Sequence, residues 1–106
     1  MLKEMDAVEL GRRHSGDEKL VVLDVREPDE WVTSSIAGTL QIPMREVPQR
    51  LHEIPKDAAI AVMCHHGGRS ERVANFLLSQ GYSDVTNVCG GIDAYSRDVD
   101  PDVPRY

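Results

Sequence analysis

Residues 60–82, IAVMCHHGGRSERVANFLLSQGY, decide the fold class of this chain. An apolar run ends at Cys64, a polar and glycine-containing loop follows, and a helical pattern then extends from Ser70 to Gln80. Apolar residues recur on one face of that pattern, and Gly81 is placed to stop it. The stretch therefore predicts a buried strand, a tight loop and a helix, with a cysteine at the carboxyl end of the strand.

The same alternation of strand and helix patterns extends along the whole chain. Apolar or β-branched runs that predict strands occupy residues 19–25, 39–43, 58–64 and 84–90. Helical patterns occupy residues 7–14, 28–31, 44–54 and 70–80. Strands separated by helices favour right-handed crossovers, so we expect an α/β fold with a mostly parallel sheet and helices on both faces. Ligands bind beyond the carboxyl ends of such strands, where Cys64 and Arg26 are expected.

The loop from Cys64 to Arg69 has the composition of an anion cradle. Gly67 and Gly68 permit positive φ, which lets backbone N–H groups converge, and the helix behind adds its own free N–H groups and positive dipole end. A thiol has a pKa of about 8.5, and lowering it by two units requires about 2.7 kcal/mol. Two or three N–H bonds to the anion supply that energy. We expect Cys64 to be a reactive thiolate at a partly exposed site; the alternative is an inert cysteine that ends a buried strand.

Composition narrows the class of protein. The chain has 106 residues, 28% of them charged and 41% hydrophobic, with a net charge of −6. These values predict one globular domain, residues 1–106, and argue against nucleic acid or an anionic membrane as the main partner. No signal peptide or apolar stretch of membrane-spanning length is visible, and the cysteines number two. We therefore expect free thiols and a cytoplasmic location.

Four motifs, in order, make the chain resemble the single-domain form of the rhodanese family. They are LDVREPDEW, SIAGTLQIP, CHHGGRS and GYSDVTNVCGGIDAY. The resemblance implies a rhodanese-like fold with a parallel sheet of about five strands. It also implies a sulfurtransferase that carries sulfane sulfur as a persulfide on Cys64, without a cofactor. Carried over by position, the loop that holds this sulfur consists of His65, His66, Gly67, Gly68 and Arg69, with Ser70 opening the helix behind.

The sequence departs from the family pattern at three positions. Ser35 stands where the family usually has histidine, Tyr95 replaces a tryptophan, and Cys89 occupies a variable position. None of the three is the nucleophile. Cys89 has two interpretations, as inert filling of a terminal strand or as a resolving thiol near Cys64.

Charged and polar residues around the loop also have alternative roles. Arg69 has a planar fork that suits thiosulfate or another oxyanion, or it holds the loop closed by a structural hydrogen bond. We expect Asp24 and Arg26 to brace the loop rather than to take part in chemistry. A metal site made by Cys64 and the next two histidines is not expected, because three consecutive residues do not converge easily on one ion.

The leading hypothesis is a thiosulfate sulfurtransferase-like enzyme. Its partners would be a small-molecule sulfur donor, or a protein persulfide, and a thiophilic acceptor; similarity of the tail DVDPDVPRY to sulfur-relay proteins adds a sulfur-carrier or thiol protein as a candidate. Two alternatives are a non-catalytic rhodanese-like interaction module and a phosphatase or arsenate reductase. Related phosphatase loops place five residues between cysteine and arginine, whereas four separate Cys64 from Arg69.

Overall fold

The computed structural model describes residues 2–16 and 19–106. The predicted domain of residues 1–106 thus includes three positions, 1, 17 and 18, that lie outside the described residues. The strands are β1 (Lys3–Met5), β2 (Leu20–Asp24), β3 (Leu40–Gln41), β4 (Ala59–Met63) and β5 (Val85–Val88). The helices are α1 (Ala7–Ser15), α2 (Pro28–Thr33), the 3-10 segment η1 (Met44–Glu53), α3 (Gly68–Ser79) and α4 (Gly91–Asp98).

The five strands form one parallel sheet in the order β1-β5-β4-β2-β3. This confirms the predicted α/β fold with a parallel sheet. The strand β4, which precedes the cysteine, lies at the centre between β5 and β2. Four of the strands coincide with runs predicted from the sequence, although β3 is only two residues long. The strand β1 was not predicted, because two of its three residues are the exposed, charged Lys3 and Glu4.

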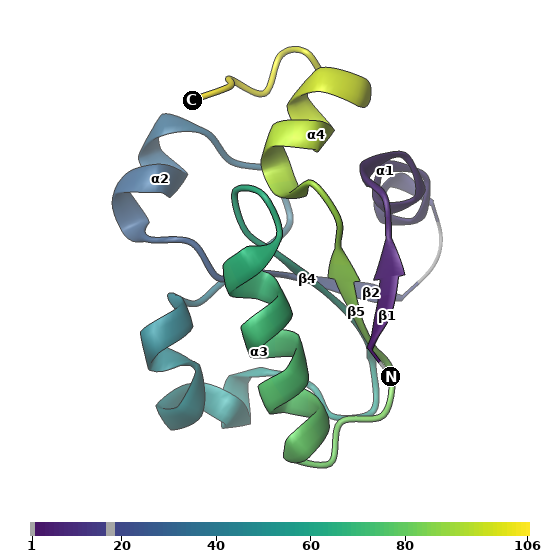
Figure 1. Ribbon diagram of the computed structural model, residues 1–106, viewed down its shortest axis with the longest axis vertical. Coiled ribbons are helices and arrows are strands. Elements are labelled where there is room, and N and C mark those ends of the chain that lie inside the picture. Colours follow the sequence, from purple (N-terminus) through teal and green to yellow (C-terminus); the bar gives the residue numbers. More distant parts are fainter. Residues whose placement is uncertain (1, 17–18) are drawn as a thin grey trace.

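Helices cover both faces of the sheet (Figure 1). On one face, α3 and η1 pack over a hydrophobic cluster to which α3 contributes Val73 and Leu77. On the other face, α1 and α4 pack over a second cluster that contains Leu10 and Ile92. Burial of these apolar faces is the main favourable term for each layer. No helix among residues 2–16 and 19–106 has the length and apolar character needed to cross a membrane.

The carboxyl ends of β2 and β4 face α2 and the C-terminal segment (Figure 1). In Figure 1 the yellow C-terminal segment runs from α4 toward α2, above the green loop that leads into α3. Pro28 is the first residue of α2, where its missing N–H costs nothing. This end of the sheet is where the predicted site residues gather.

Candidate active site

Cys64 follows the last residue of β4 and is buried, with only 1% of its surface exposed. This corrects the expectation of a partly exposed thiol, because the loop after β4 folds closely over the sulfur. The backbone N–H of Gly67 donates to the Cys64 sulfur at 3.0 Å. The sulfur thus lies at the focus of the loop, as the cradle hypothesis requires.

Only one of the two loop glycines has a positive φ. Gly67 has φ of +121°, a conformation that L-residues with a side chain rarely adopt. Gly68 does not have a positive φ and is already the first residue of α3, so the helix begins two residues before the predicted start at Ser70. The curl of the loop therefore depends on Gly67, and the N-terminal end of α3 lies closer to the cysteine than the sequence suggested.

The pKa of the Cys64 thiol lies below its ordinary value. Burial raises this pKa, but it is outweighed by hydrogen bonds from the Ser70 hydroxyl and from the backbone N–H groups of Ser70, Gly67 and His66. Donors that converge on a sulfur favour its anionic form. The direction of the shift agrees with the prediction from the sequence, and no neighbouring base is needed to produce it.

Ser70 and Asn87 form a polar pair beneath the sulfur. Ser70 is fully buried, and its Oγ lies 3.3 Å from the Cys64 sulfur and 2.6 Å from Asn87 Oδ1. The Asn87 side-chain amide donates in turn to the Gly67 carbonyl at 3.3 Å. Sequence reasoning did not single out Asn87, although an amide within an apolar strand run was an available signal. Asn87 belongs to β5, and its side chain holds the loop in place through Ser70 and Gly67.

The start of α4 fixes the backbone of the cysteine. The N–H of Ile92 donates to the Cys64 carbonyl at 2.9 Å, and that of Asp93 donates to the His65 carbonyl at 3.1 Å. A Cβ atom at Gly91, whose φ is +55°, would lie 2.3 Å from the Cys64 carbonyl oxygen. Glycine is therefore required there for helix and loop to approach this closely.

Arg69 is paired with Glu30, a residue that sequence reasoning missed. Its guanidinium donates from Nη1 to Glu30 Oε1 at 2.6 Å and from Nη2 to Oε2 at 2.9 Å. This two-bond geometry corresponds to the structural alternative for Arg69, and it joins the loop to α2. A signal for Glu30 was its position in the first turn of a predicted helix beside the Arg26 motif.

Asp24 and Arg26 form an ion pair whose side chains are both fully buried, with Arg26 Nη2 at 2.7 Å from Asp24 Oδ2. Arg26 also donates to the carbonyls of Glu30 and Ser34 and to the Tyr106 hydroxyl. These bonds run to α2 and its C-terminal end and to the C-terminal segment, not to residues 64–70. The bracing that we predicted is therefore indirect, since Arg26 holds the helix whose Glu30 holds Arg69.

His65 and His66 lie on the solvent-facing side of the cysteine loop, which we call its mouth. The His65 ring stacks on that of Tyr106, with ring centroids 4.0 Å apart, and the His66 ring is tilted relative to it at the same centroid distance. Ligand atoms of His65, His66 and Asp93 lie within 4.8 Å of one another. However, the Asp93 carboxylate already accepts from Arg105 at 3.1 Å, and the His65 ring stacks on that of Tyr106. We assign these residues to the mouth, not to a metal.

Cys89 differs from Cys64 in its surroundings. It is a free, partly buried thiol just after β5, and its pKa is raised, first by burial and then by the nearby Glu4 carboxylate. A raised pKa makes it a poor nucleophile near neutral pH, which favours the inert interpretation over a resolving role. Of the other two departures, Ser35 is exposed just after α2, and Tyr95 of α4 is buried in the second hydrophobic cluster.

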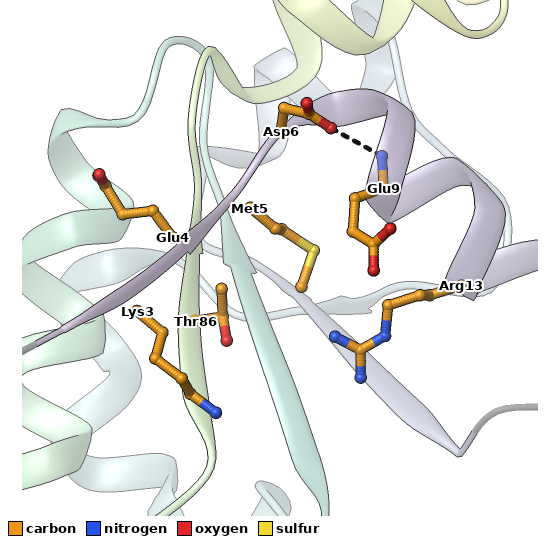
Figure 2. Close-up of a pocket in the computed structure, with 7 residues that line it drawn as sticks. All are labelled: Lys3, Glu4, Met5, Asp6, Glu9, Arg13 and Thr86. Atoms are coloured by element: carbon orange, nitrogen blue, oxygen red, sulfur yellow. Dashed lines mark hydrogen bonds between the residues drawn. The ribbon is translucent and has the colours of Figure 1, made fainter.

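A polar hollow of about 420 Å³ lies at the far edge of the sheet (Figure 2). It is lined by residues of β1 and α1 with Thr86, and the Asp6 carboxylate beside it accepts the Glu9 N–H at 2.8 Å. Both acidic and basic side chains line it, and none of residues 64–70 contributes to it. This hollow is therefore separate from the loop that surrounds the Cys64 sulfur.

The parallel sheet and the cysteine loop define an α/β protein with a buried thiol at a strand end, where loop donors bond to the sulfur. The model of the rhodanese-like domain matches residues 7–98, and the chain belongs to this family. A sulfurtransferase from Allochromatium vinosum is 38% identical over 97 residues, which cover 92% of this chain and 91% of that protein. The thiosulfate sulfurtransferase GlpE from Tolumonas auensis is 33% identical over 72 residues, which cover 68% of each.

The fold also matches a solved relative. The crystal structure of a rhodanese-related protein from Thermoplasma volcanium aligns with a TM-score of 0.81 at 33% identity, covering 92% of this chain and 93% of that one. Together with the relatives named as sulfurtransferases, this supports rhodanese-type sulfur transfer as the general class of activity.

Proposed function

We propose that the protein is a sulfurtransferase in which Cys64 carries a sulfane sulfur as a persulfide. The observation that carries the proposal is the convergence of the Gly67 N–H and the Ser70 hydroxyl on a buried sulfur, at 3.0 and 3.3 Å. These donors stabilise a sulfur anion, which is the reactive form at the start and at the end of each transfer.

The reaction proceeds in two steps. The Cys64 thiolate attacks the outer sulfur of a donor such as thiosulfate; the new bond joins Sγ to that sulfur, and the old S–S bond breaks with its electrons leaving on sulfite. A thiophilic acceptor, cyanide in an assay or a thiol of a small molecule or carrier protein, then attacks the outer sulfur of the persulfide. The Cys64 thiolate is regenerated, and the loop donors stabilise it as the leaving group.

The contacts of the loop weaken both alternatives. A non-catalytic module has no need of a thiol with a lowered pKa, whereas Cys64 has one. A phosphatase needs a cation at the position of Ser70, and this residue is a buried serine bonded to Asn87.

The test is the intact mass of the protein after incubation with thiosulfate or with a low-molecular-weight persulfide. Wild-type protein is expected to gain one sulfur atom and to lose it when cyanide is added. The Cys64→Ser variant is expected to gain none. Cys89→Ser is the matched control, which removes the second thiol and is expected to gain the sulfur as wild type does. Full transfer activity in Cys64→Ser would refute the proposal.

A further inference from the structure

Arg69, the cationic residue of the active-site loop, already has an anionic partner. Both terminal nitrogens of Arg69 donate to the carboxylate of Glu30, and the Glu30 side chain is only 16% exposed. A bidentate pair of this kind uses the fork geometry that a sulfonate or phosphate would otherwise occupy. An anion that approached Cys64 through Arg69 would have to compete with this carboxylate.

Glu30 is itself held from two further directions. The N–H of Glu27 donates to its Oε1 at 3.0 Å, and the Tyr106 hydroxyl donates to its Oε2 at 2.7 Å. Tyr106 accepts from Arg26 at 2.8 Å, and its ring stacks on His65, so the hydroxyl is fixed in place. The bonds from Arg69, and then those from Tyr106 and Glu27, outweigh burial and lower the pKa of Glu30 to about 2. The carboxylate stays ionised at any physiological pH.

Two other ionisable groups beside the loop add little positive charge to it. Burial, followed by the neighbouring His66, lowers the pKa of His65 and so disfavours the charged form of its imidazole. The Asp93 carboxylate is paired with Arg105 at 3.1 Å. The loop thus stabilises a negative sulfur through N–H and O–H dipoles, while its own arginine is neutralised.

We propose that Glu30 determines the class of sulfur donor, by occupying Arg69 and so disfavouring donors that carry an additional anionic group such as the sulfonate of thiosulfate. The inference rests on the proposed function. The favoured donors are persulfides, R–S–SH, whose reacting end contains only sulfur. The Cys64 thiolate attacks the outer sulfur, the S–S bond of the donor breaks, and the electron pair leaves on the thiolate R–S⁻, giving Cys64–S–SH.

The experiment compares two donors in single-turnover persulfide formation on Cys64. The donors are thiosulfate and 2-hydroxyethyl persulfide, which has no charged group besides its sulfane sulfur. In Glu30→Gln the rate with thiosulfate, relative to the rate with the persulfide, is expected to rise roughly fivefold or more, the change expected when about one unit of charge is released at a partly exposed site. Asp29→Asn removes the same charge from a neighbouring, exposed position of α2 and is expected to leave the ratio unchanged.

Dependence on Arg69 separates this role from a merely structural one. The double variant Glu30→Gln/Arg69→Gln is expected to lose the gain with thiosulfate, because no arginine remains to attract the sulfonate. Arg69→Gln alone leaves the Glu30 carboxylate without its cation and is expected to lower the ratio, whereas the double variant removes both charges and is expected to show a ratio close to wild type. If Arg69 were the thiosulfate-binding group in the native protein, the double variant would instead fall below wild type, and this result would overturn the proposal even if Glu30→Gln failed to fold.

A second readout does not require sulfur transfer. The ratio of the alkylation rates of Cys64 by iodoacetate and by iodoacetamide reports the attraction of an anion to the site, since both reagents react with the same thiolate. This ratio is expected to rise in Glu30→Gln and to return to the wild-type value in the double variant. Persulfide formation with unchanged ratios in the variants would overturn the role of Glu30 and leave the proposed function intact. Absence of any persulfide with both donors would overturn the proposed function, and the inference about donors with it.

Discussion

The hydroxyl of Ser70 lies 3.3 Å from the sulfur of Cys64, and it has two other acceptors within reach. These are Asn87 Oδ1 at 2.6 Å and the Gly67 carbonyl at 3.1 Å. A hydroxyl has one proton, so it donates fully to only one acceptor at a time. When Cys64 ionises, the charge on sulfur favours rotation of this proton toward it. Ser70 is therefore a donor whose contribution increases with the negative charge on the sulfur.

Ser70→Ala is expected to raise the pKa of the Cys64 thiol by about one to two units, because one charge-assisted hydrogen bond is removed. The rate of alkylation by iodoacetamide as a function of pH measures the midpoint directly. Ser79→Ala removes an exposed hydroxyl from the end of the same helix, where it bonds to the Phe76 carbonyl, and serves as the control. A midpoint that is the same in both variants would show that the Ser70 hydroxyl does not act on the sulfur.

The two cysteines are expected to lose reactivity at different pH values as the pH falls. Burial raises the pKa of Cys64, but the loop donors outweigh burial, and the net pKa is lowered. Burial and then the Glu4 carboxylate raise the pKa of Cys89. As the pH falls from 9 toward 6, labelling of Cys89 should decline first, and the ratio of Cys64 to Cys89 label should rise. Peptide mass spectrometry after a short pulse of iodoacetamide measures this ratio. A constant ratio over that range would contradict the assigned directions.

Gly91→Ala is expected to destabilise the protein by about 2 kcal/mol or more, since the new methyl group collides with a backbone oxygen that cannot move freely. A Cβ there would lie 2.3 Å from the Cys64 carbonyl oxygen and 2.5 Å from that of His65. Gly68→Ala is the matched control, because no atom lies within 4 Å of its added Cβ and its φ is not positive. That variant should change the free energy of unfolding by less than about 0.5 kcal/mol. Urea denaturation measures both, and equal effects would contradict the geometry at Gly91.

Glu30 is expected to contribute stability that is lost in acid. Its pKa is about 2 in the folded protein, lowered chiefly by Arg69, against an ordinary value of 4.5. A depressed pKa stabilises the fold fully above the unfolded value, and this contribution disappears as the pH falls from about 4.5 toward 2. The contribution amounts to about 3 kcal/mol at most.

Urea denaturation between pH 6 and pH 2.5 measures this effect. Glu30→Gln should be less stable than wild type at pH 6 and should approach it as the pH falls, whereas Asp29→Asn should follow the wild-type curve. A Glu30→Gln curve that runs parallel to wild type throughout would show that the carboxylate is not the group that titrates.

The sequence predicted what local patterns can specify. The cysteine loop, the helix behind it and the central strands follow from apolar periodicity and from glycine placement within about 20 residues. The strand β1 was missed because Lys3 and Glu4 give no strand pattern, and pairing with β5 creates that strand. Periodicity also does not distinguish a loop glycine from the first residue of a helix, which is why Gly68 was placed in the loop.

The supporting residues of the site come from distant parts of the chain. Asn87 reaches Ser70 across 17 positions, and Tyr106 reaches Arg26 across 80. Such contacts depend on the order of the strands and on the path of the final segment, and no local pattern reports either. Glu30 was missed for the same reason, since its partner Arg69 lies 39 positions away.

The short outer strands have a consequence for behaviour at high concentration. A sheet edge offers unpaired N–H and C=O groups to any other chain, and long, flat, apolar edges are sites of aggregation. Here one edge is β3, with two residues, and the other is β1, with three, of which Lys3 and Glu4 carry exposed charges. An incoming strand would find too few hydrogen-bonding groups for a stable ladder and would bury charge on one side. The native sheet is therefore protected against growth by strand addition at both ends, even though its inner strands are longer and mostly apolar.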